Sequence, residues 1–267
     1  MGVPASKPQA VTPAGRPTAG RQLQFEWAGR ISPEQWEIYR AALETVREAG
    51  VPFMLGGGFA LATYTGRWRD TKDIDFYIKP ENRGTVVDAL SKAGFGDYFS
   101  RLPYDRGWIY RSTRNEVIVD IIWSMANRRA AVDDEWFERA GTVVLRGEKL
   151  LVLPREEFMW CKLYILQRDH CDWTDLFSLL YVDAEQIDWE HLLDRLGEDE
   201  PLLKALLTVY GWLCPGETLR LPERLCEKLS MPRRPQAPAP PRTDRIRLLD
   251  SRCWFAALRE PGEKLEV

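Results

Sequence analysis

Two aspartates stand one residue apart in the stretch DIDFYI, residues 73–78, where polar and apolar residues alternate. Alternation predicts a β-strand, and residues two apart on a strand point to the same face. The carboxylates of Asp73 and Asp75 would therefore repel each other unless something neutralises them. A divalent cation removes that repulsion, and Mg²⁺ prefers oxygen ligands. The pair predicts a metal site, with a solvated strand edge as the alternative interpretation.

A third aspartate, Asp120, lies inside the apolar stretch VIVDIIW, residues 117–123. A charge among apolar neighbours is costly unless it is paired or bound to a metal. Two interpretations stay open for this residue. Asp120 is either a third metal ligand or an ion-pair partner of Arg69 or Lys72.

Three glycines precede a short apolar segment that predicts a helix over about residues 59–64. The amide groups at the start of a helix, together with its positive dipole end, bind anions. Gly57 and Gly58 are therefore candidate phosphate-binding residues. A plain flexible turn is the alternative interpretation.

Lys162 lies in FMWCKLYIL, with four apolar residues on each side. A lysine in such surroundings either extends its ammonium to solvent or pairs with an acid. The first interpretation is ordinary packing. The second makes Lys162 a phosphate ligand, with Asp172 or Asp175 orienting it or the acceptor. Asp175 also fits the start of a helix beside Thr174.

The segment GGGFALATYTGRWRDTKDID, residues 56–75, resembles the G-G…D-x-D signature of the nucleotidyltransferase fold, the DNA polymerase beta superfamily. Its patterns G-G-x-A-L and R-x-T-x-D-I-D are similar to those of bacterial nucleotidyltransferases of the abortive-infection toxin type. The segment PREEFMWCKLYILQRDHCDWTDL, residues 154–176, is similar to the lysine-bearing helix and Asp-rich turn that follow this core. The likeness covers roughly residues 50–215.

The resemblance implies a role for each matching residue. Asp73, Asp75 and Asp120 match the catalytic, metal-ligating carboxylates, which two Mg²⁺ ions would bridge to a triphosphate. Lys162 is also implied to be a catalytic residue, which would contact that triphosphate. The implied nucleotide-binding residues are Gly57, Gly58, Arg69, Thr71, Lys72 and Asp175. For the basic residues among them, ordinary surface cations are the alternative.

The implied activity is Mg²⁺-dependent transfer of a nucleoside monophosphate from an NTP, such as ATP, to an acceptor hydroxyl. The acceptor would belong to a small molecule, a protein or an RNA end, and the likeness adds a toxin–antitoxin or phage-defence role by analogy. Many members carry a phosphate-contacting Ser after Gly-Gly, where this chain has Gly58 or Phe59. The rival hypothesis is therefore a non-catalytic nucleotide-binding or interaction protein that keeps the fold.

The composition limits the classes of function. The 267 residues carry a net charge of −3, which argues against a large nucleic-acid footprint but allows a local RNA-end contact. No run approaches the roughly 18 apolar residues of a membrane span. Two histidines exclude a multi-histidine metal site, and five cysteines without a C-x-x-C pair predict reduced thiols in a cytoplasmic protein.

Local signals predict the elements that must position these residues. Ser32 and Pro33 predict a helix start. The stretch VPFML, residues 51–55, predicts a short buried strand, and Arg146-Gly147 predicts the turn of a hairpin.

The order of the elements predicts an α+β fold. Residues 25–153 would form a nucleotidyltransferase-type mixed sheet with flanking helices, followed by a helical domain over residues 154–230. Residues 1–24 are rich in Pro, Ala and Gly and predict a disordered leader. Residues 231–267 form a Pro-rich spacer and an amphipathic tail, either docked or free. The sequence leaves the oligomeric state open.

Overall fold

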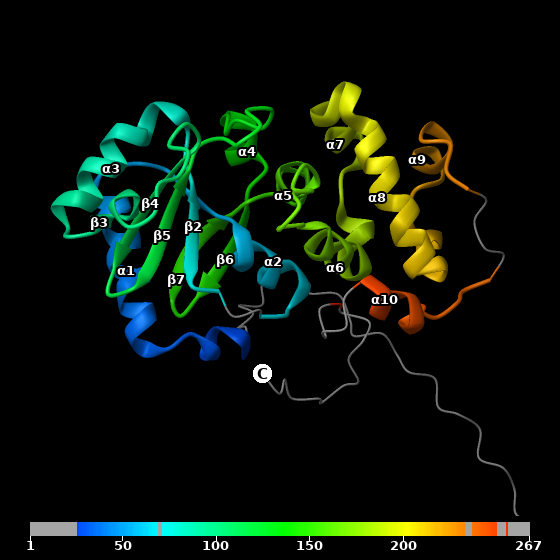
Figure 1. Ribbon diagram of the computed structural model, residues 1–267, viewed down its shortest axis with the longest axis horizontal. Coiled ribbons are helices and arrows are strands. Elements are labelled where there is room, and N and C mark those ends of the chain that lie inside the picture. Colours follow the sequence, from blue (N-terminus) through cyan, green and yellow to red (C-terminus); the bar gives the residue numbers. More distant parts are fainter. Residues whose placement is uncertain (1–25, 69–70, 233–236, 250–254, 256–267) are drawn as a thin grey trace, which may run out of the picture.

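A mixed β-sheet and a group of helices lie side by side along the long axis of the molecule (Figure 1). The computed structural model describes residues 26–68, 71–232, 237–249 and 255. The predicted leader, Arg69 and most of the predicted C-terminal tail lie outside the described residues.

Seven strands form the sheet of the described chain, in the order β3-β4-β5-β2-β1-β7-β6. The strands are β1 (Met54–Leu55), β2 (Asp73–Tyr77), β3 (Gly96–Asp97), β4 (Ile109–Arg114), β5 (Val117–Ile122), β6 (Gly141–Leu145) and β7 (Glu148–Val152). β2 pairs with β5 and β1 pairs with β7 in parallel, whereas the other four pairs are antiparallel. The sheet is therefore mixed, which confirms the predicted fold class.

Helices flank the sheet and continue beyond it (Figure 1). Helix α1 (Pro33–Glu48) precedes the first strand, and the helices between the strands are α2 (Gly57–Thr65), α3 (Arg83–Lys92) and α4 (Asp134–Glu138). The helices after the last strand are α5 (Arg155–Leu163), α6 (Trp173–Asp183), α7 (Trp189–Leu196), α8 (Glu200–Leu213), α9 (Glu223–Lys228) and α10 (Thr243–Leu249). Within the described ranges, no helix has the length and apolar character needed to cross a membrane.

The first helix and the first strand differ in how well local signals predict them. Ser32 Oγ accepts a hydrogen bond from Gln35 N (3.1 Å) at the start of α1, as the predicted cap requires. The predicted strand over residues 51–55 is too long, because only the two residues of β1 pair with neighbours. Pro52 has no amide hydrogen to donate to a ladder, so pairing begins after it.

Both long hairpins turn through two residues with positive φ. Arg146 and Gly147 adopt φ of +48° and +87° between β6 and β7, which confirms the predicted turn. Asn115 and Glu116 adopt φ of +49° and +65° between β4 and β5. Two-residue turns of this kind match the twist of the strands and fix which residues face each other.

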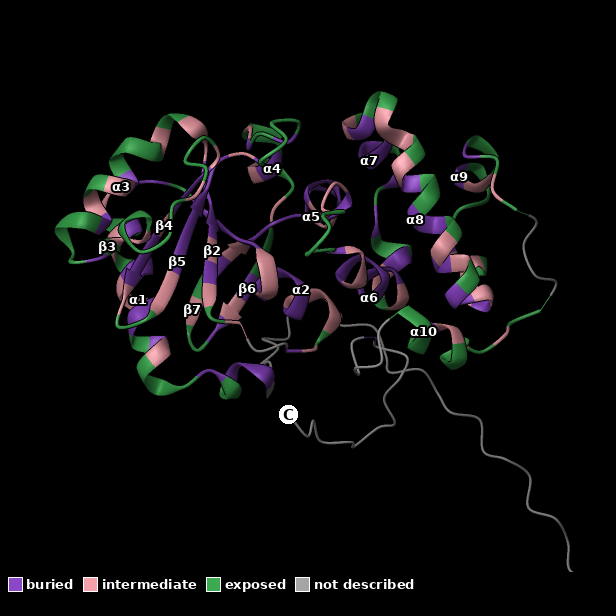
Figure 2. Cartoon of the chain, viewed as in Figure 1, coloured by how far each residue is buried: buried purple, intermediate pink, exposed green. Residues whose placement is uncertain are grey.

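The centre of the sheet is buried, with alternating burial at the start of β2 and four consecutive buried residues at the end of β5 (Figure 2). Ile74, Phe76, Val119 and Ile121 have no exposed surface and belong to the core. Successive side chains on a strand point to opposite faces. The aspartates at the intervening positions therefore lie on the face away from these core residues.

The C-terminal segment docks on the helices. Ile246 of α10 is fully buried, and Phe255 is buried with its ring centroid 5.4 Å from that of Tyr181 on α6. Arg242 N donates a hydrogen bond to the Leu213 carbonyl oxygen at the end of α8 (2.8 Å). Of the two alternatives for the tail, these described residues support docking.

Candidate active site

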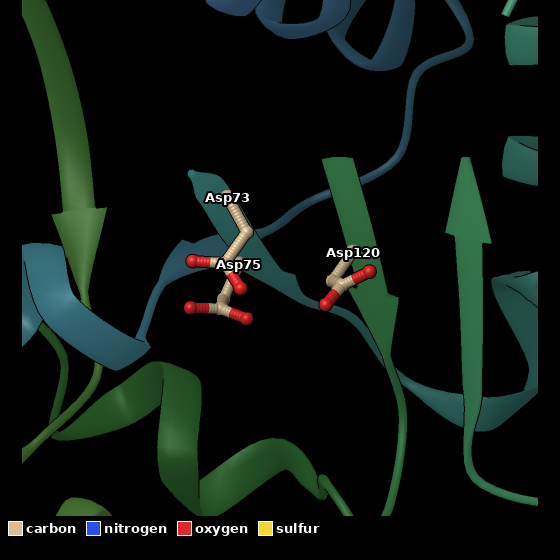
Figure 3. A group of neighbouring side chains, drawn as sticks. All are labelled: Asp73, Asp75 and Asp120. Carbon is tan, nitrogen blue, oxygen red and sulfur yellow. The ribbon is translucent and has the colours of Figure 1, made fainter. Parts of the chain in front are cut away.

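The three aspartates come from the two parallel strands at the centre of the sheet. The register of β2 and β5 places Asp75 opposite Asp120, and Asp73 precedes Asp75 on the same face of β2. Each offers a carboxylate oxygen, and these oxygens all lie within 4.8 Å of one another. Figure 3 shows the three side chains gathered at one place on the sheet. Asp120 is 1% exposed, whereas Asp73 and Asp75 are half-buried.

Burial and repulsion between carboxylates disfavour the charged forms of Asp75 and Asp120. Burial raises the pKa of Asp75 well above its ordinary value, and the carboxylates of Asp73 and Asp120 raise it further, while Lys162 and Arg111 oppose them. Burial also raises the pKa of Asp120, against the hydrogen bonds of Arg111. A group of oxygen ligands under such repulsion suits a hard divalent cation.

Gly57 packs against the carboxylate of Asp75 at the start of α2. Its φ of +46° lies in the left-handed region, and a Cβ atom there would overlap Asp75 Oδ2 and lie 2.8 Å from Asp75 Cγ. Gly56 N donates to the Asp75 carbonyl oxygen (3.0 Å), which fixes the turn on β2. α2 begins without a side-chain cap. Its first amide groups therefore have no side-chain partner at the cap, and amides at a helix start are groups that bind anions.

Gly58 and Phe59 are the two candidates for the position at which many similar proteins carry Ser, and their surroundings differ. Phe59 is a core residue, 1% exposed, with its ring centroid 5.7 Å from that of Tyr39 in an edge-on contact. Gly58 is half-buried, and a Cβ atom there would meet the Thr71 side chain at 3.6 Å, an ordinary contact distance. Position 58 is therefore the one at which a small side chain fits beside the site.

Lys162 pairs with acids and does not extend to solvent. Its side chain is 12% exposed, and Nζ lies 2.9 Å from Asp175 Oδ2 and also contacts Asp172 Oδ2. Burial lowers the pKa of Lys162, but the carboxylates of Asp175 and Asp172 outweigh it and raise the pKa above the ordinary value. Lys162 also lowers the pKa of Asp75, so its charge acts on one of the three aspartates. The lysine therefore connects α5 and the start of α6 electrostatically to the site on the sheet.

Asp120 pairs with Arg111 on β4, a residue not singled out in the sequence, and not with Lys72. Arg69, the other suggested partner, lies outside the described residues. Arg111 Nε lies 2.8 Å from Asp120 Oδ1, and Arg111 Nη2 lies 2.6 Å from Asp120 Oδ2. The antiparallel register places the two residues directly opposite each other. Counting outward from the Asn115-Glu116 turn gives this pairing, so the signal was present in the sequence.

Thr71 and Lys72, two further predicted nucleotide-binding residues, immediately precede β2. Thr71 Oγ1 donates a hydrogen bond to Asp73 Oδ1, and the Thr71 carbonyl oxygen accepts one from Gln35 Nε2 (3.1 Å). Lys72 is exposed, and its carbonyl oxygen accepts from Ile118 N (3.2 Å). α1 thus supports the loop before the aspartates through Gln35, which sequence analysis also missed.

Replacing Gly57 with Ala is expected to displace the Asp75 carboxylate and to lower the free energy of unfolding by about 1–3 kcal/mol, since the new side chain meets both strain and overlap. Gly58→Ala is the matched control and should change that free energy by less than about 1 kcal/mol. Urea denaturation of the two variants measures the difference. Equal losses in both variants would contradict the contact between Gly57 and Asp75.

Comparisons with known proteins give one family and several similar structures. The family model described as uncharacterised nucleotidyltransferase matches residues 33–210. No curated protein matches the chain.

Three of the solved structures similar to this chain are as follows. The antibiotic-resistance factor ANT(2'')-Ia is 16% identical, with 65% of this chain and 95% of that chain covered and a TM-score of 0.46. The lincosamide antibiotic adenylyltransferase LnuA is 15% identical, with 49% and 85% covered and a TM-score of 0.37. JHP933 from Helicobacter pylori is 17% identical, with 67% and 80% covered and a TM-score of 0.37.

The family match spans the turn at Gly57, the three aspartates and Lys162, and it extends over more than half of the chain. The chain therefore belongs to the uncharacterised nucleotidyltransferase family, and the protein is a transferase.

Proposed function

We propose that the protein transfers a nucleoside monophosphate from an NTP to an acceptor hydroxyl in a Mg²⁺-dependent reaction. The observation that carries this proposal is the group of three carboxylate oxygens within 4.8 Å of one another beside the uncapped start of α2. One feature attracts cations and the other attracts anions. Their close approach suits a magnesium–triphosphate complex.

Asp73, Asp75 and Asp120 would hold the metal, and their oxygen-only donor set fits Mg²⁺. When bound, the ion supplies charge neutralisation to the triphosphate and lowers the pKa of the acceptor hydroxyl. The raised pKa of Asp75 supports this assignment, because a charged carboxylate that burial disfavours gains stability from an added cation.

The chain's own residues would bind and orient the triphosphate. The backbone amides at Gly57 and Gly58 would donate hydrogen bonds to its phosphate oxygens, and Lys162 would add a positive charge. Thr71 holds Asp73 in place through its hydroxyl. The proposed further contacts of the nucleotide are Arg69, Lys72 and Asp175. Catalysis then consists mainly of positioning and charge neutralisation.

The donor is ATP or another NTP, and the acceptor hydroxyl belongs to a small molecule, a protein or an RNA end. A toxin–antitoxin or phage-defence role stays a prediction that rests on sequence resemblance. The proposal is tested by titrating ATP, GTP, CTP and UTP into the protein by calorimetry, with Mg²⁺ and with EDTA. We expect at least one NTP to bind with Mg²⁺ and to lose that binding in EDTA. Equal binding in EDTA, or none with any NTP, would overturn the metal site.

A further inference from the structure

The contact between Arg111 and Asp120 uses both oxygens of a proposed metal ligand. Arg111 Nε lies 2.8 Å from Asp120 Oδ1 and 3.2 Å from Oδ2, and Nη2 lies 2.6 Å from Oδ2. The Asp120 side chain is 2% exposed, so solvent offers it little alternative. A guanidinium held in this two-point geometry is a strong partner for a carboxylate. In the nucleotide-free protein, Arg111 therefore occupies the Asp120 oxygens that a metal ion would have to bind.

The two cations would also repel each other. A guanidinium in hydrogen-bond contact with Asp120 lies close to any divalent ion that Asp120 coordinates, and charges at such short range interact strongly in a partly buried site. Asp75 lies directly opposite Asp120 in the β2–β5 register, so the charge of Arg111 is close to more than one of the carboxylates. The positive charge of Arg111 thus opposes metal binding by the whole group of aspartates.

The backbone of Arg111 is held by hydrogen bonds, and its side chain has a second partner besides Asp120. Its amide donates a hydrogen bond to Tyr104 Oη (2.8 Å), and its carbonyl oxygen accepts one from the same hydroxyl (3.3 Å). The side chain is 32% exposed, and its guanidinium carbon lies 5.9 Å from the centre of the Tyr98 ring. Tyrosine rings attract guanidinium groups. The Tyr98 ring therefore already lies near the guanidinium and would remain a partner for it once the contact with Asp120 is released.

We propose that Arg111 is a positioning residue that occupies Asp120 in the nucleotide-free protein and leaves it when Mg²⁺ enters together with the triphosphate. This inference rests on the proposed function, since it assumes the metal site of the three aspartates. The triphosphate supplies negative charge that offsets the displaced guanidinium, whereas the metal alone does not. The contact thereby couples metal binding to nucleotide binding and keeps the site from loading with metal by itself.

The test compares the affinity for Mn²⁺ without nucleotide, measured by calorimetry, in variants that separate charge from hydrogen bonding. Arg111→Gln keeps a donor beside Asp120 and removes the charge, so it should bind Mn²⁺ about tenfold more tightly than the parent. Arg111→Lys keeps the charge and should bind Mn²⁺ within about twofold of the parent. Arg106→Gln is the control, since this exposed arginine pairs with Asp97 and not with the site. Unchanged or weaker Mn²⁺ binding by Arg111→Gln would overturn the proposal.

A measurement on the parent protein makes the test independent of how the variants fold. The NMR signal of the Arg111 Nε–H group should shift when Mg²⁺ and a non-hydrolysable ATP analogue are added together, and it should stay in place with Mg²⁺ alone at the same concentration. A signal that stays in place with both ligands bound would overturn the proposal. If the parent shows no Mg²⁺-dependent nucleotide binding, the proposed function fails. If it does show such binding and Arg111 stays on Asp120, only the coupling role fails.

Discussion

Replacing Lys162 with Met is expected to lower the free energy of unfolding by about 3–5 kcal/mol, the range for removing one partner of a buried ion pair. The Met side chain keeps the volume of the lysine stem but leaves Asp172 and Asp175 facing each other without a cation. Both carboxylates are less than a tenth exposed, with side-chain exposures of 8% and 6%. Urea denaturation at neutral pH in EDTA measures this loss.

Two further variants separate the ion pair from general effects of the substitution. Lys149→Met removes an exposed lysine on β7 and should change stability by less than about 0.5 kcal/mol. The double variant Lys162→Met/Asp175→Asn should recover part of the loss, because one of the unpaired charges is gone. A cost below about 1 kcal/mol for Lys162→Met would contradict the buried pairing and favour a solvated lysine. With the pairing established, weaker NTP binding by the double variant than by Asp175→Asn alone would support the proposed contact between Lys162 and phosphate.

Replacing Asp75 with Asn is expected to have opposite effects on the metal-free protein and on the complex. In EDTA at neutral pH the variant should be as stable as the parent or more stable by up to about 1 kcal/mol in the free energy of unfolding, since a repelling charge has been removed. The same change should abolish the Mg²⁺-dependent rise in Tm that an NTP produces, because that rise requires binding to the folded state. Nucleotidyl transfer should be lost as well. Thermal unfolding with and without Mg²⁺ and NTP measures both effects.

The pH dependence of the free energy of unfolding of the metal-free protein is a second test of the Asp75 carboxylate. The folded-state pKa of Asp75 lies above its unfolded value, mainly because of burial. The folded state therefore binds the extra proton between the two pKa values, and stability from this group falls as pH rises through that interval. Asp75→Asn should remove this part of the slope. Asp88→Asn, which changes an exposed aspartate on α3, should leave the slope unchanged.

Two outcomes for Asp75→Asn would count against the site. If the variant unfolds in EDTA, the carboxylate is a structural partner and its charge is not held at a cost. If an NTP still raises the Tm of the variant in a Mg²⁺-dependent way, the metal binds elsewhere.

Local patterns were enough to predict the elements that carry the site. Asp73 and Asp75 could be assigned to one face of a strand because side chains alternate along a strand, and the register confirms a common face. The Arg146-Gly147 turn was predictable because the residues that tolerate positive φ are few. These features depend on residues that are neighbours in the sequence.

Features that depend on pairing between distant segments were harder to predict. The partner of Asp120 follows from the register of the β4–β5 hairpin, which requires locating the turn at Asn115 to the residue. The reason for glycine at position 57 is the Asp75 carboxylate, which the antiparallel pairing of β1 with β2 brings against it. Sequence alone also did not decide whether Lys162 extends to solvent or pairs with an acid, because the contact with Asp172 depends on how α5 and α6 pack.

The measurement that tests the central claim most directly is a transfer assay with NTP labelled at either the α- or the γ-phosphate. Cell extract supplies the acceptor, and Mg²⁺ is present. The parent protein should transfer the α-label to a product and release the γ-label with pyrophosphate, and Asp75→Asn should transfer neither. Transfer of the γ-label, or α-label transfer that survives in Asp75→Asn, would contradict nucleotidyl transfer at the three aspartates.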